Sequence, residues 1–543
     1  MNKTKNLKSN LFLFICFILA FKMTDSQTIE WERRFDGNID SLVYNGVSMA
    51  QDNNSNLYVT AAITAATGTD ILLVKYDSNG NMLWERRFNG DGNEYDFSRC
   101  VKIDLTGNIY VAGASRRPNG STDYCILKYN PSGELIWTKL YRYTLGRNHI
   151  MDMKIDNNGY IYVTGYSAAE FLSDFATIKY DSAGTLKWVA RYDGPLHEDD
   201  GAVSIDIDDA GNVYAGGYTI GSSGQPDYAA VKYDSNGNEL WRQTYDSPAH
   251  SLDMVSVIKA DNLGNSYVTG HSFEPPYYSF CLIKYNSSGQ QIWIKRHLGS
   301  NNSGAIAGNI KLDAGGNVYI TGADINTSIN MDGCIMKYDS SGNMLWRKTY
   351  NGPEDGDDIF FQMILVEKGI YITGTSIGPG NNRNFCILKF NENGQEQWTA
   401  RYDVNGCLNA YMNSLAVDQT GKVYFSGLVW ENNAWRLATV KYSQPIGIQN
   451  INSEIPKEFR LFQNYPNPFN PSTKIKFAIP KTSVVKLAVY DLLGREVESL
   501  VNQQMNPGTY EVNWNAARFS SGIYLYRLET SDFQIVKKMS LIK

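Results

Sequence analysis

Side chains that bind transition metals or act as nucleophiles are scarce in this chain of 543 residues. It has seven cysteines and five histidines, and no histidine stands in an HExxH or HxH pair of the kind that holds zinc. Acidic residues gather at 198–200 and 354–358, but acidic loops are usually solvated. We therefore find no catalytic motif and expect that the protein is not an enzyme.

Positive charge is also limited. Lysine and arginine total 50 against 56 acidic residues, and the formal net charge is -6. A protein that grips nucleic acid needs a basic surface to displace the counterions of the phosphates. We therefore expect no nucleic-acid partner.

Long apolar runs are absent except near the N-terminus. There, Lys3, Lys5 and Lys8 precede the apolar run Leu11–Phe21, and a short polar stretch follows. This arrangement is typical of a secretory signal peptide, and the run is too short to cross a bilayer comfortably. We predict a signal peptide at residues 1–26 and a mature chain, without a transmembrane segment, that is secreted or held on the outer cell surface. An uncleaved anchor is the alternative.

One of the seven cysteines, Cys16, lies in this apolar run, and the other six do not form an evident disulfide set. Four of them stand three residues before the lysine of a recurring Lys-Tyr pair, where other copies carry Leu or Ala: Cys125, Cys281, Cys334 and Cys386. Equivalent points in neighbouring packed sheets lie about 10 Å apart, beyond the roughly 7 Å limit for bridged alpha carbons. We predict four buried free thiols and leave Cys100 and Cys407 undecided.

Repetition is what the chain has in abundance. The motif DxxGNxYVxG places a tyrosine every 52 or 53 residues, at positions 58, 110, 162, 214, 267, 319, 371 and 424. A second motif alternates with it and joins a Lys-Tyr pair, a DSNG-type turn and a tryptophan, as in KYDSNGNMLW from position 75. Asp, Asn and Gly in both turns favour tight hairpins. Each repeat therefore predicts four antiparallel strands, which is one blade of a β-propeller.

The tryptophan strand is displaced relative to the other repeat elements. It occurs eight times, but the copy at Trp31 precedes the first complete repeat and none follows Tyr442. We predict an all-β fold in which residues 27–445 form an eight-bladed β-propeller, closed by the N-terminal strand Trp31–Phe35. Closure removes the open sheet edges at which unwanted pairing begins. An open solenoid is the alternative, and it would need capping ends.

The repeat period stops at Tyr442, and a different composition follows. We predict an exposed linker at residues 446–458 and then, at residues 459–543, an immunoglobulin-like β-sandwich of alternating strands separated by Pro, Gly and Asn turns. The segments QNYPNPFNPSTKIKFAIP, YDLLGREV, SSGIYLYRL and the terminal KKMSLIK occur there in order. Together they resemble the C-terminal sorting domain of type IX secretion substrates.

This resemblance implies a partner and a destination. Sorting domains of that family engage the type IX secretion machinery, which carries the protein across the outer membrane, and the domain is then commonly removed. The alternative for residues 459–543 is a generic immunoglobulin-like adhesion module. Either implies a secreted or surface location.

The propeller repeats resemble two further groups. They are similar to the bacterial SBBP-type propeller family, which implies the fold but no reaction. The YDSNGNMLW strand pair also resembles the tryptophan motifs of quinoprotein propellers. Quinoprotein alcohol dehydrogenases carry two adjacent cysteines over their cofactor, and this sequence has no such pair.

The loops of the repeats divide into a uniform and a varied set. The two turn types hardly change from copy to copy, and in a four-stranded blade they emerge on one face. The loops before the first strand and between the second and third strands emerge on the opposite face and differ between copies. Binding residues concentrate on loops held by a rigid frame. We therefore take as candidate ligand-binding residues Arg116, Arg117, Tyr277, Tyr278, Arg383, Trp430 and Trp435.

A group of acidic residues recurs fourteen positions before the repeat tyrosine. Its members are Asp96, Asp200, Asp253 and Asp357, with Asn148 in a further copy. The register places them where the innermost strand begins. Oxygen ligands of this kind favour calcium, although such an Asp more often caps a turn.

Together these observations favour an exported, noncatalytic propeller that binds a glycan or a protein ligand. We expect no cofactor other than calcium. Two alternatives stay open, namely an extracellular enzyme of the quinoprotein or polysaccharide-cleaving type, and a structural component of a surface layer.

Overall fold

The computed structural model describes residues 29–543 except 38, 40–45, 145, 170–171, 300–302, 326–329, 368, 403–409, 444–448, 453–455, 506 and 517–518. The predicted signal peptide at residues 1–26 and Cys407 lie outside the described residues. Across the part of the chain that is described, no helix has the length and apolarity needed to cross a bilayer. The described elements are β-strands and one short 3-10 helix, η2 (Pro379–Asn381).

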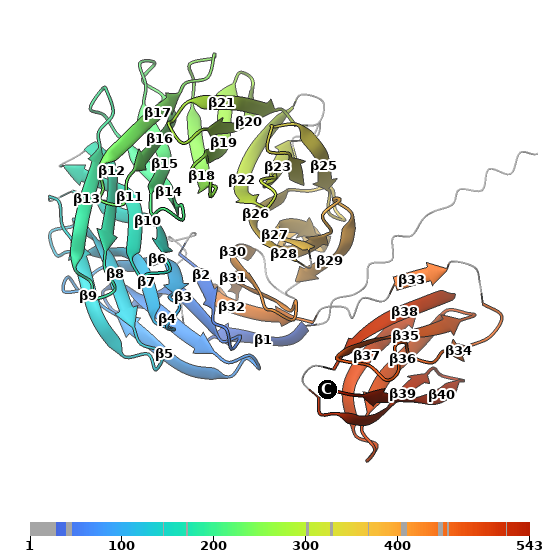
Figure 1. The fold of residues 1–543 in the computed structure, drawn as a ribbon. Helices are drawn as coiled ribbons and strands as arrows, with labels where there is room; N and C mark the ends of the chain where they lie inside the picture. The colour runs from blue at the N-terminus through green and yellow to red at the C-terminus, as the bar shows by residue number, and fades with distance from the viewer. Residues whose placement is uncertain are drawn as a thin grey trace, which may run out of the picture.

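Eight four-stranded antiparallel sheets stand around a common centre as the blades of a propeller (Figure 1). Blades 1 and 2 are built from β2 (Ser48–Gln51), β3 (Leu57–Ala65), β4 (Gly68–Tyr76) and β5 (Met82–Phe88), and from β6 (Asp96–Ile103), β7 (Ile109–Arg116), β8 (Thr122–Tyr129) and β9 (Leu135–Tyr141). Blades 3 and 4 are built from β10 (Asn148–Ile155), β11 (Ile161–Ala169), β12 (Leu172–Tyr180) and β13 (Leu186–Tyr192), and from β14 (Gly201–Ile207), β15 (Val213–Ile220), β16 (Pro226–Tyr233) and β17 (Glu239–Tyr245).

The remaining blades follow the same plan. Blades 5 and 6 are built from β18 (Asp253–Ala260), β19 (Ser266–Glu274), β20 (Tyr277–Tyr285) and β21 (Gln291–His297), and from β22 (Gly304–Leu312), β23 (Val318–Ile325), β24 (Met331–Tyr338) and β25 (Met344–Tyr350). Blades 7 and 8 are built from β26 (Asp358–Val366), β27 (Gly369–Gly378), β28 (Asn382–Phe390) and β29 (Glu396–Tyr402), and from β30 (Ala410–Val417), β31 (Val423–Glu431), β32 (Ala434–Tyr442) and β1 (Ile29–Phe35).

The ring closes through the N-terminal strand, as the sequence predicts. β1 pairs antiparallel with β32, with Trp31 opposite Lys441 and Phe35 opposite Leu437. Trp31 and Phe35 are buried in a hydrophobic cluster that includes Val59 of blade 1. The eighth blade therefore contains the first and last strands of the propeller sequence, with β1 as its outermost strand.

The DxxGNxY motif has a local physical role that blade 2 illustrates. The carboxylate of Asp104 accepts hydrogen bonds from the backbone N–H and the side-chain amide of Asn108, both at 2.9 Å, and from the hydroxyl of Tyr110 at 3.0 Å. The motif's final glycine, Gly113, faces an irregularity in β6, where a Cβ would lie 2.0 Å from the carbonyl oxygen of Phe97. A larger residue would push the two innermost strands apart.

The Lys-Tyr and tryptophan motif joins neighbouring blades. In blade 4, the Nζ of Lys232 and the Nε1 of Trp241 both donate to the carbonyl oxygen of Ser287, at 3.2 Å each, and Ser287 lies in the turn between β20 and β21 of blade 5. The same pair in blade 8, Lys441 and Trp31, donates to Ser78 of blade 1. The repeat therefore builds the contact between blades as well as the blade itself.

The chain after the propeller forms two sheets of a β-sandwich. One sheet contains β33 (Gln449–Asn452), β38 (Gly508–Asn515), β35 (Ser472–Ile479) and β34 (Arg460–Leu461), and the other contains β37 (Glu496–Met505), β36 (Ser483–Tyr490), β39 (Gly522–Glu529) and β40 (Gln534–Leu541). Between them lies a core that includes Phe477, Trp514 and Tyr526. This confirms the predicted sandwich.

The structure differs from the sequence prediction at the linker. β33 lies inside residues 446–458 and pairs with β38. A four-residue edge strand is held by backbone hydrogen bonds, which its mostly polar side chains do not reveal.

Within the described residues, five buried cysteines form no disulfide, namely Cys100, Cys125, Cys281, Cys334 and Cys386. The four predicted buried thiols are confirmed, and Cys100 joins them. Burial raises the pKa of Cys100 to about 12, which keeps its sulfur protonated and unreactive at neutral pH.

Candidate functional site

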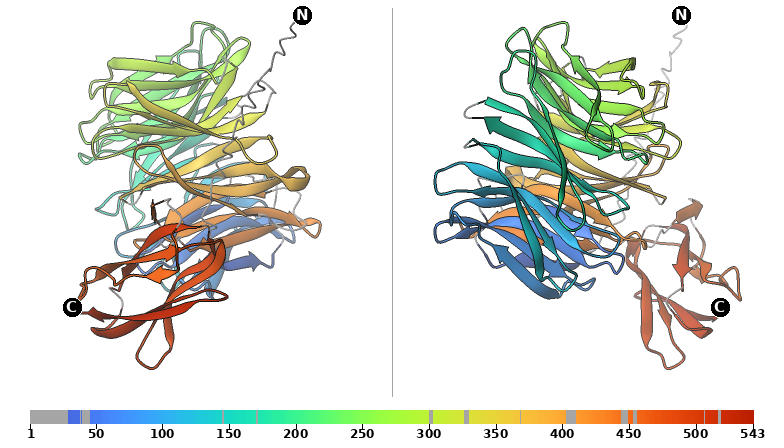
Figure 2. Two further views of the ribbon diagram at one scale, coloured as in Figure 1. Left: turned by 90° about the vertical axis from the view of Figure 1, so that its right-hand side faces the viewer. Right: turned by 60° about the vertical axis from the view of Figure 1, so that its left-hand side comes forward.

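The varied loops emerge from one face of the propeller disc and the uniform turns from the other. Figure 2 shows the disc turned toward its edge, with the strands of each blade crossing its thickness. All seven predicted ligand-binding residues lie at the varied face, in blades 2, 5, 7 and 8. They belong to four separate loops around the ring.

Arg116 and Arg117 lie at the end of β7. The guanidinium of Arg116 lies over the ring of Tyr95, 5.4 Å from its centroid. Arg117 donates through Nε to Oδ1 of the buried Asp123 at 2.8 Å, and Arg142 donates to Oδ2 of the same carboxylate at 2.8 Å. Arg117 therefore neutralises a buried charge, which is a structural role.

Tyr277 and Tyr278 begin β20. Tyr277 is 43% exposed, whereas Tyr278 is half-buried and packs against Phe273 and His271, with ring centroids 4.8 and 5.4 Å apart. Tyr277 thus offers an open aromatic face, and Tyr278 supports the hairpin.

Trp430 and Trp435 lie opposite each other in the β31–β32 hairpin of blade 8. Their rings meet edge to face at 5.3 Å. Both are half-buried, and Trp435 also packs against the hydrophobic cluster between blades 8 and 1. The pair covers the ring closure and keeps part of its aromatic surface at the varied face.

Arg383 pairs with Asp357 at 3.6 Å. The acid that begins the innermost strand of this blade is Asp358, which stands opposite Ser376 as Asp96 stands opposite Ser115 in blade 2. The predicted position, Asp357, is one residue away from the equivalent site. The offset arises because the β26–β27 hairpin has a shorter turn than the DxxGN turns of the other blades.

Asp96, Asp200, Asp253 and Asp358 share a capping role. Each is buried and accepts the backbone N–H of the residue six positions earlier, as Asp96 does from Gly90 at 2.6 Å and Asp253 from Ser247 at 2.7 Å. Burial raises the pKa of all four carboxyl groups. Asn148 uses its side-chain amide in the same place, donating to the carbonyl oxygen of Thr122 at 2.6 Å. The recurring acid therefore holds the loop that precedes the innermost strand of its blade.

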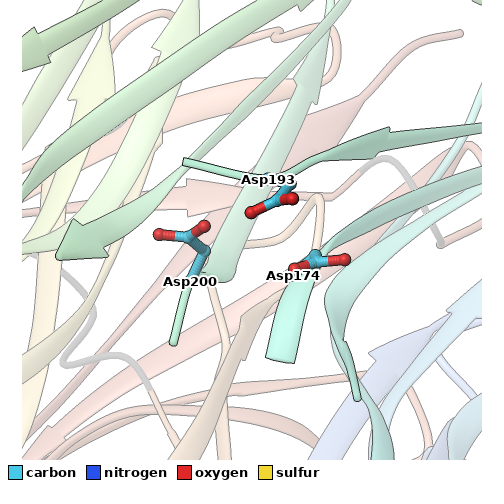
Figure 3. A group of neighbouring side chains, drawn as sticks. All are labelled: Asp174, Asp193 and Asp200. Carbon is cyan, nitrogen blue, oxygen red and sulfur yellow. The ribbon is translucent and has the colours of Figure 1, made fainter. Parts of the chain in front are cut away.

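Two of these acids belong to larger clusters. Asp174, Asp193 and Asp200 gather between blades 3 and 4 (Figure 3), and Asp227, Asp246 and Asp253 gather between blades 4 and 5. In each cluster one oxygen from every carboxylate lies within 4.8 Å of the others. The sequence pattern predicts one member of each cluster. The partners come from different strands, so that only the register of neighbouring blades reveals them.

An aromatic row at the varied face was not predicted from the sequence. The ring of His149 stacks between Phe97 and Tyr166, with centroids 5.2 and 5.0 Å apart and interplanar angles of 22° on both sides. All three side chains are partly exposed. Burial and the nearby Arg147 lower the pKa of His149 to about 4, so that the ring is neutral at pH 7. The sequence does place Phe97 and His149 at one repeat position, because they directly follow Asp96 and Asn148.

Charged side chains also gather on the innermost strands toward the uniform face. Lys102, Lys154, Lys259 and Lys311 occupy one register position in four blades, each opposite a motif tyrosine, and Asp206 occupies it in blade 4. Asp206 pairs with Lys154 at 2.9 Å and Lys259 at 3.2 Å. Burial, followed by repulsion from Lys154 and Lys102, lowers the pKa of Lys311 to about 8.

One segment has the spacing of a serine hydrolase motif. Residues 374–378 read GTSIG, but Ser376 lies within β27, is buried, and is paired with Arg401. A nucleophile elbow needs an exposed serine at a sharp turn from strand to helix. Ser376 is therefore a structural residue.

Comparison with known proteins identifies the C-terminal domain. Residues 463–543 match the secretion system C-terminal sorting domain. The domain is that of type IX secretion, and it indicates secretion to the outer surface or the medium. A sorting domain of this kind implies engagement with the type IX secretion machinery.

The larger relatives are distant. The chain is 25% identical over 405 residues to an uncharacterized WD repeat-containing protein of Acanthamoeba polyphaga mimivirus, which covers 67% of this chain. It is 24% identical over 294 residues to the regulatory protein FlaEY of Caulobacter vibrioides, which covers 49% of this chain. The chain spans about a quarter of these relatives' own length, 27% in both cases.

Solved structures show weaker likeness. PorZ, described as an essential bacterial surface component of the type IX secretion system of Porphyromonas gingivalis, is 13% identical, covering 91% of this chain and 74% of its own, at a TM-score of 0.33. A fungal alcohol oxidase in complex with copper is 12% identical, covering 96% of this chain and 100% of its own, at 0.44. Likeness at this level adds no argument about function.

Proposed function

We propose that this chain is an exported, noncatalytic binding protein whose varied propeller face holds a glycan. The type IX sorting domain delivers it to the outer surface or the medium. The propeller, which we assign to the SBBP-type repeats, binds the ligand. A noncatalytic role is supported by the titratable side chains of that face, since many of them serve structural ion pairs such as Arg117–Asp123 and Arg191–Asp174.

The stacked row Phe97–His149–Tyr166 carries this proposal. Flat, neutral aromatic rings that are partly exposed bind the apolar faces of sugar rings and provide contact area at low entropic cost. The row is held by three strands of two blades, β6, β10 and β11, so that its geometry is fixed before a ligand arrives. Tyr277 and the Trp430–Trp435 pair extend the aromatic character of the same face.

A glycan-binding screen on the full mature chain tests the proposal, followed by calorimetry on any glycan that binds. Tyr166→Ala should weaken the binding about 10-fold or more, because it removes one stacked ring, which corresponds to about 1.4 kcal/mol. Tyr160→Ala is the matched control, since Tyr160 is a half-buried aromatic residue in a uniform-face turn. Binding that persists in Tyr166→Ala, Phe97→Ala and Trp430→Ala alike would refute a role for this face.

A further inference from the structure

The carboxylates of Asp227, Asp246 and Asp253 meet where blade 4 joins blade 5. Asp227 lies on β16, Asp246 directly follows β17, and Asp253 begins β18. Asp227 is 6% exposed and Asp253 is fully buried. Three like charges in such a place repel one another at a cost that the low local dielectric increases.

The cluster between blades 3 and 4 shows how the same arrangement is normally compensated. Each of its acids precedes the corresponding acid of the other cluster by 53 residues. There, Nη2 of Arg191 donates to Asp174 at 2.6 Å, while Asp200 accepts the N–H groups of Gly194 and Ile220. The arginine supplies the positive charge inside that cluster.

The cluster between blades 4 and 5 lacks an arginine at the equivalent position. Strand register places Arg191 opposite Ala176, and the equivalent residue opposite Ala229 is Thr244. Within the described residues, Oδ1 of Asp227, Asp246 and Asp253 is buried and has no hydrogen-bond partner. The exposed His250 lies beside the cluster, and its Nδ1 is 2.6 Å from the other oxygen of Asp246.

We propose that Asp227, Asp246 and Asp253 bind one calcium ion, which takes the place that the Arg191 guanidinium holds in the neighbouring cluster. Calcium binds oxygen at about 2.3–2.6 Å, so two oxygens on one ion lie no more than about 5.2 Å apart. The 4.8 Å span of the three carboxylates fits that limit. The unpartnered oxygen of the buried Asp227 supplies a charged ligand with no competing bond. The ion would hold the 246–253 loop against blade 4. This role does not depend on ligand binding by the aromatic row.

Calcium titration of the chelator-treated mature chain, by calorimetry and by thermal unfolding, tests this site. We expect one ion per chain, and calcium at about 100 times its dissociation constant should raise the folding equilibrium constant about 100-fold. Asp227→Asn should weaken binding at least about 10-fold, because it removes one charged ligand. Thr244→Arg should also abolish binding, and it should raise the unfolding temperature without calcium because it restores the counter-charge.

The neighbouring cluster offers the reciprocal experiment. Arg191→Thr should create a second calcium site and change the stoichiometry from one to two, whereas Asp174→Asn in the wild-type background should leave the single site intact. No calcium binding at millimolar concentration would overturn the proposal. So would binding of equal strength in Thr244→Arg, a variant in which all three acids remain and the fold is expected to be stabilised.

Discussion

The indole nitrogen of Trp31 donates a hydrogen bond to the carbonyl oxygen of Ser78, 3.1 Å away. Trp188 and Ser235, at 3.1 Å, make the same contact between blades 3 and 4. The bond that joins consecutive blades elsewhere therefore joins the last blade to the first here. The displaced tryptophan found in the sequence is a component of the ring closure.

Removing this closure should destabilise the whole propeller. Trp31 is 8% exposed, and truncating a buried tryptophan to alanine costs about 3–5 kcal/mol. Trp31→Ala should therefore lower the denaturant midpoint strongly, and deletion of residues 29–36 should lower it further. Leu83→Ala is the control, since Leu83 is 51% exposed on the equivalent strand of blade 1. Equal midpoints for Trp31→Ala and Leu83→Ala would contradict closure by β1.

Alanine substitutions at two turn glycines should distinguish the stability cost of backbone strain from that of a steric clash between blades. Gly237 and Gly224 both have positive φ, at 87° and 74°. A Cβ at Gly237 would lie 2.6 Å from the ring of Trp188 in the preceding blade, whereas a Cβ at Gly224 meets nothing within 4 Å. Gly224→Ala should cost about 1–2 kcal/mol through backbone strain alone. Gly237→Ala should cost an additional ~1–3 kcal/mol, measured by chemical unfolding, and equal losses would show that the turn can move away from Trp188.

Stability without calcium should fall with rising pH because of Asp227. Burial, followed by repulsion from Asp246 and Asp253, raises the pKa of Asp227 to about 7, although His250 opposes this change. A carboxyl whose pKa is higher in the folded state favours folding while it is protonated, and this advantage is lost between about pH 4 and pH 7. A tenfold difference in proton affinity between the folded and unfolded chains corresponds to about 1.4 kcal/mol of stability.

The matched variant for this pH dependence is Asp227→Asn. In the presence of a chelator, its free energy of unfolding should decline less than that of the wild type between about pH 4 and pH 7. Parallel curves for the two proteins would mean that Asp227 ionises normally in the folded state.

The buried cysteines predict how the native protein reacts with thiol reagents. Cys125, Cys281, Cys334 and Cys386 are 0% exposed, and burial raises the pKa of the thiols of Cys125, Cys334 and Cys386 above the ordinary value. Cys100 is similarly buried. These five thiols should be unreactive toward a disulfide reagent in the native state and reactive in denaturant. Mass spectrometry of labelled peptides would identify any that reacts before unfolding.

Deleting the sorting domain should separate export from folding. A chain that lacks residues 463–543 should accumulate inside the producing cell instead of on its surface or in the medium, because the signal for outer-membrane passage lies there. A chain with Leu105→Ala, which alters an exposed turn residue of the propeller, should be exported normally. Export of the truncated chain would assign the sorting signal elsewhere.

The sequence predicted the propeller fold because the same strand pattern recurs in every repeat. Asp104, Asn108 and Tyr110 interact within one hairpin, and local contacts of this kind are encoded by their spacing. The closing role of Trp31 also followed from counting repeat elements. The short strand β33 did not, since its pairing depends on backbone groups.

Only the tertiary structure decided which side chains meet between blades. The 52- to 53-residue period fixes the position of each residue in its own blade, but contacts across blades depend on the register and rotation of two sheets. For this reason the sequence predicted Asp200 and Asp253 and missed Asp174, Asp193, Asp227 and Asp246. The same cause hid the stacking of His149 on Phe97. The repeat pattern by itself determined the scaffold, whereas packing between unlike copies determined where this protein can bind a ligand.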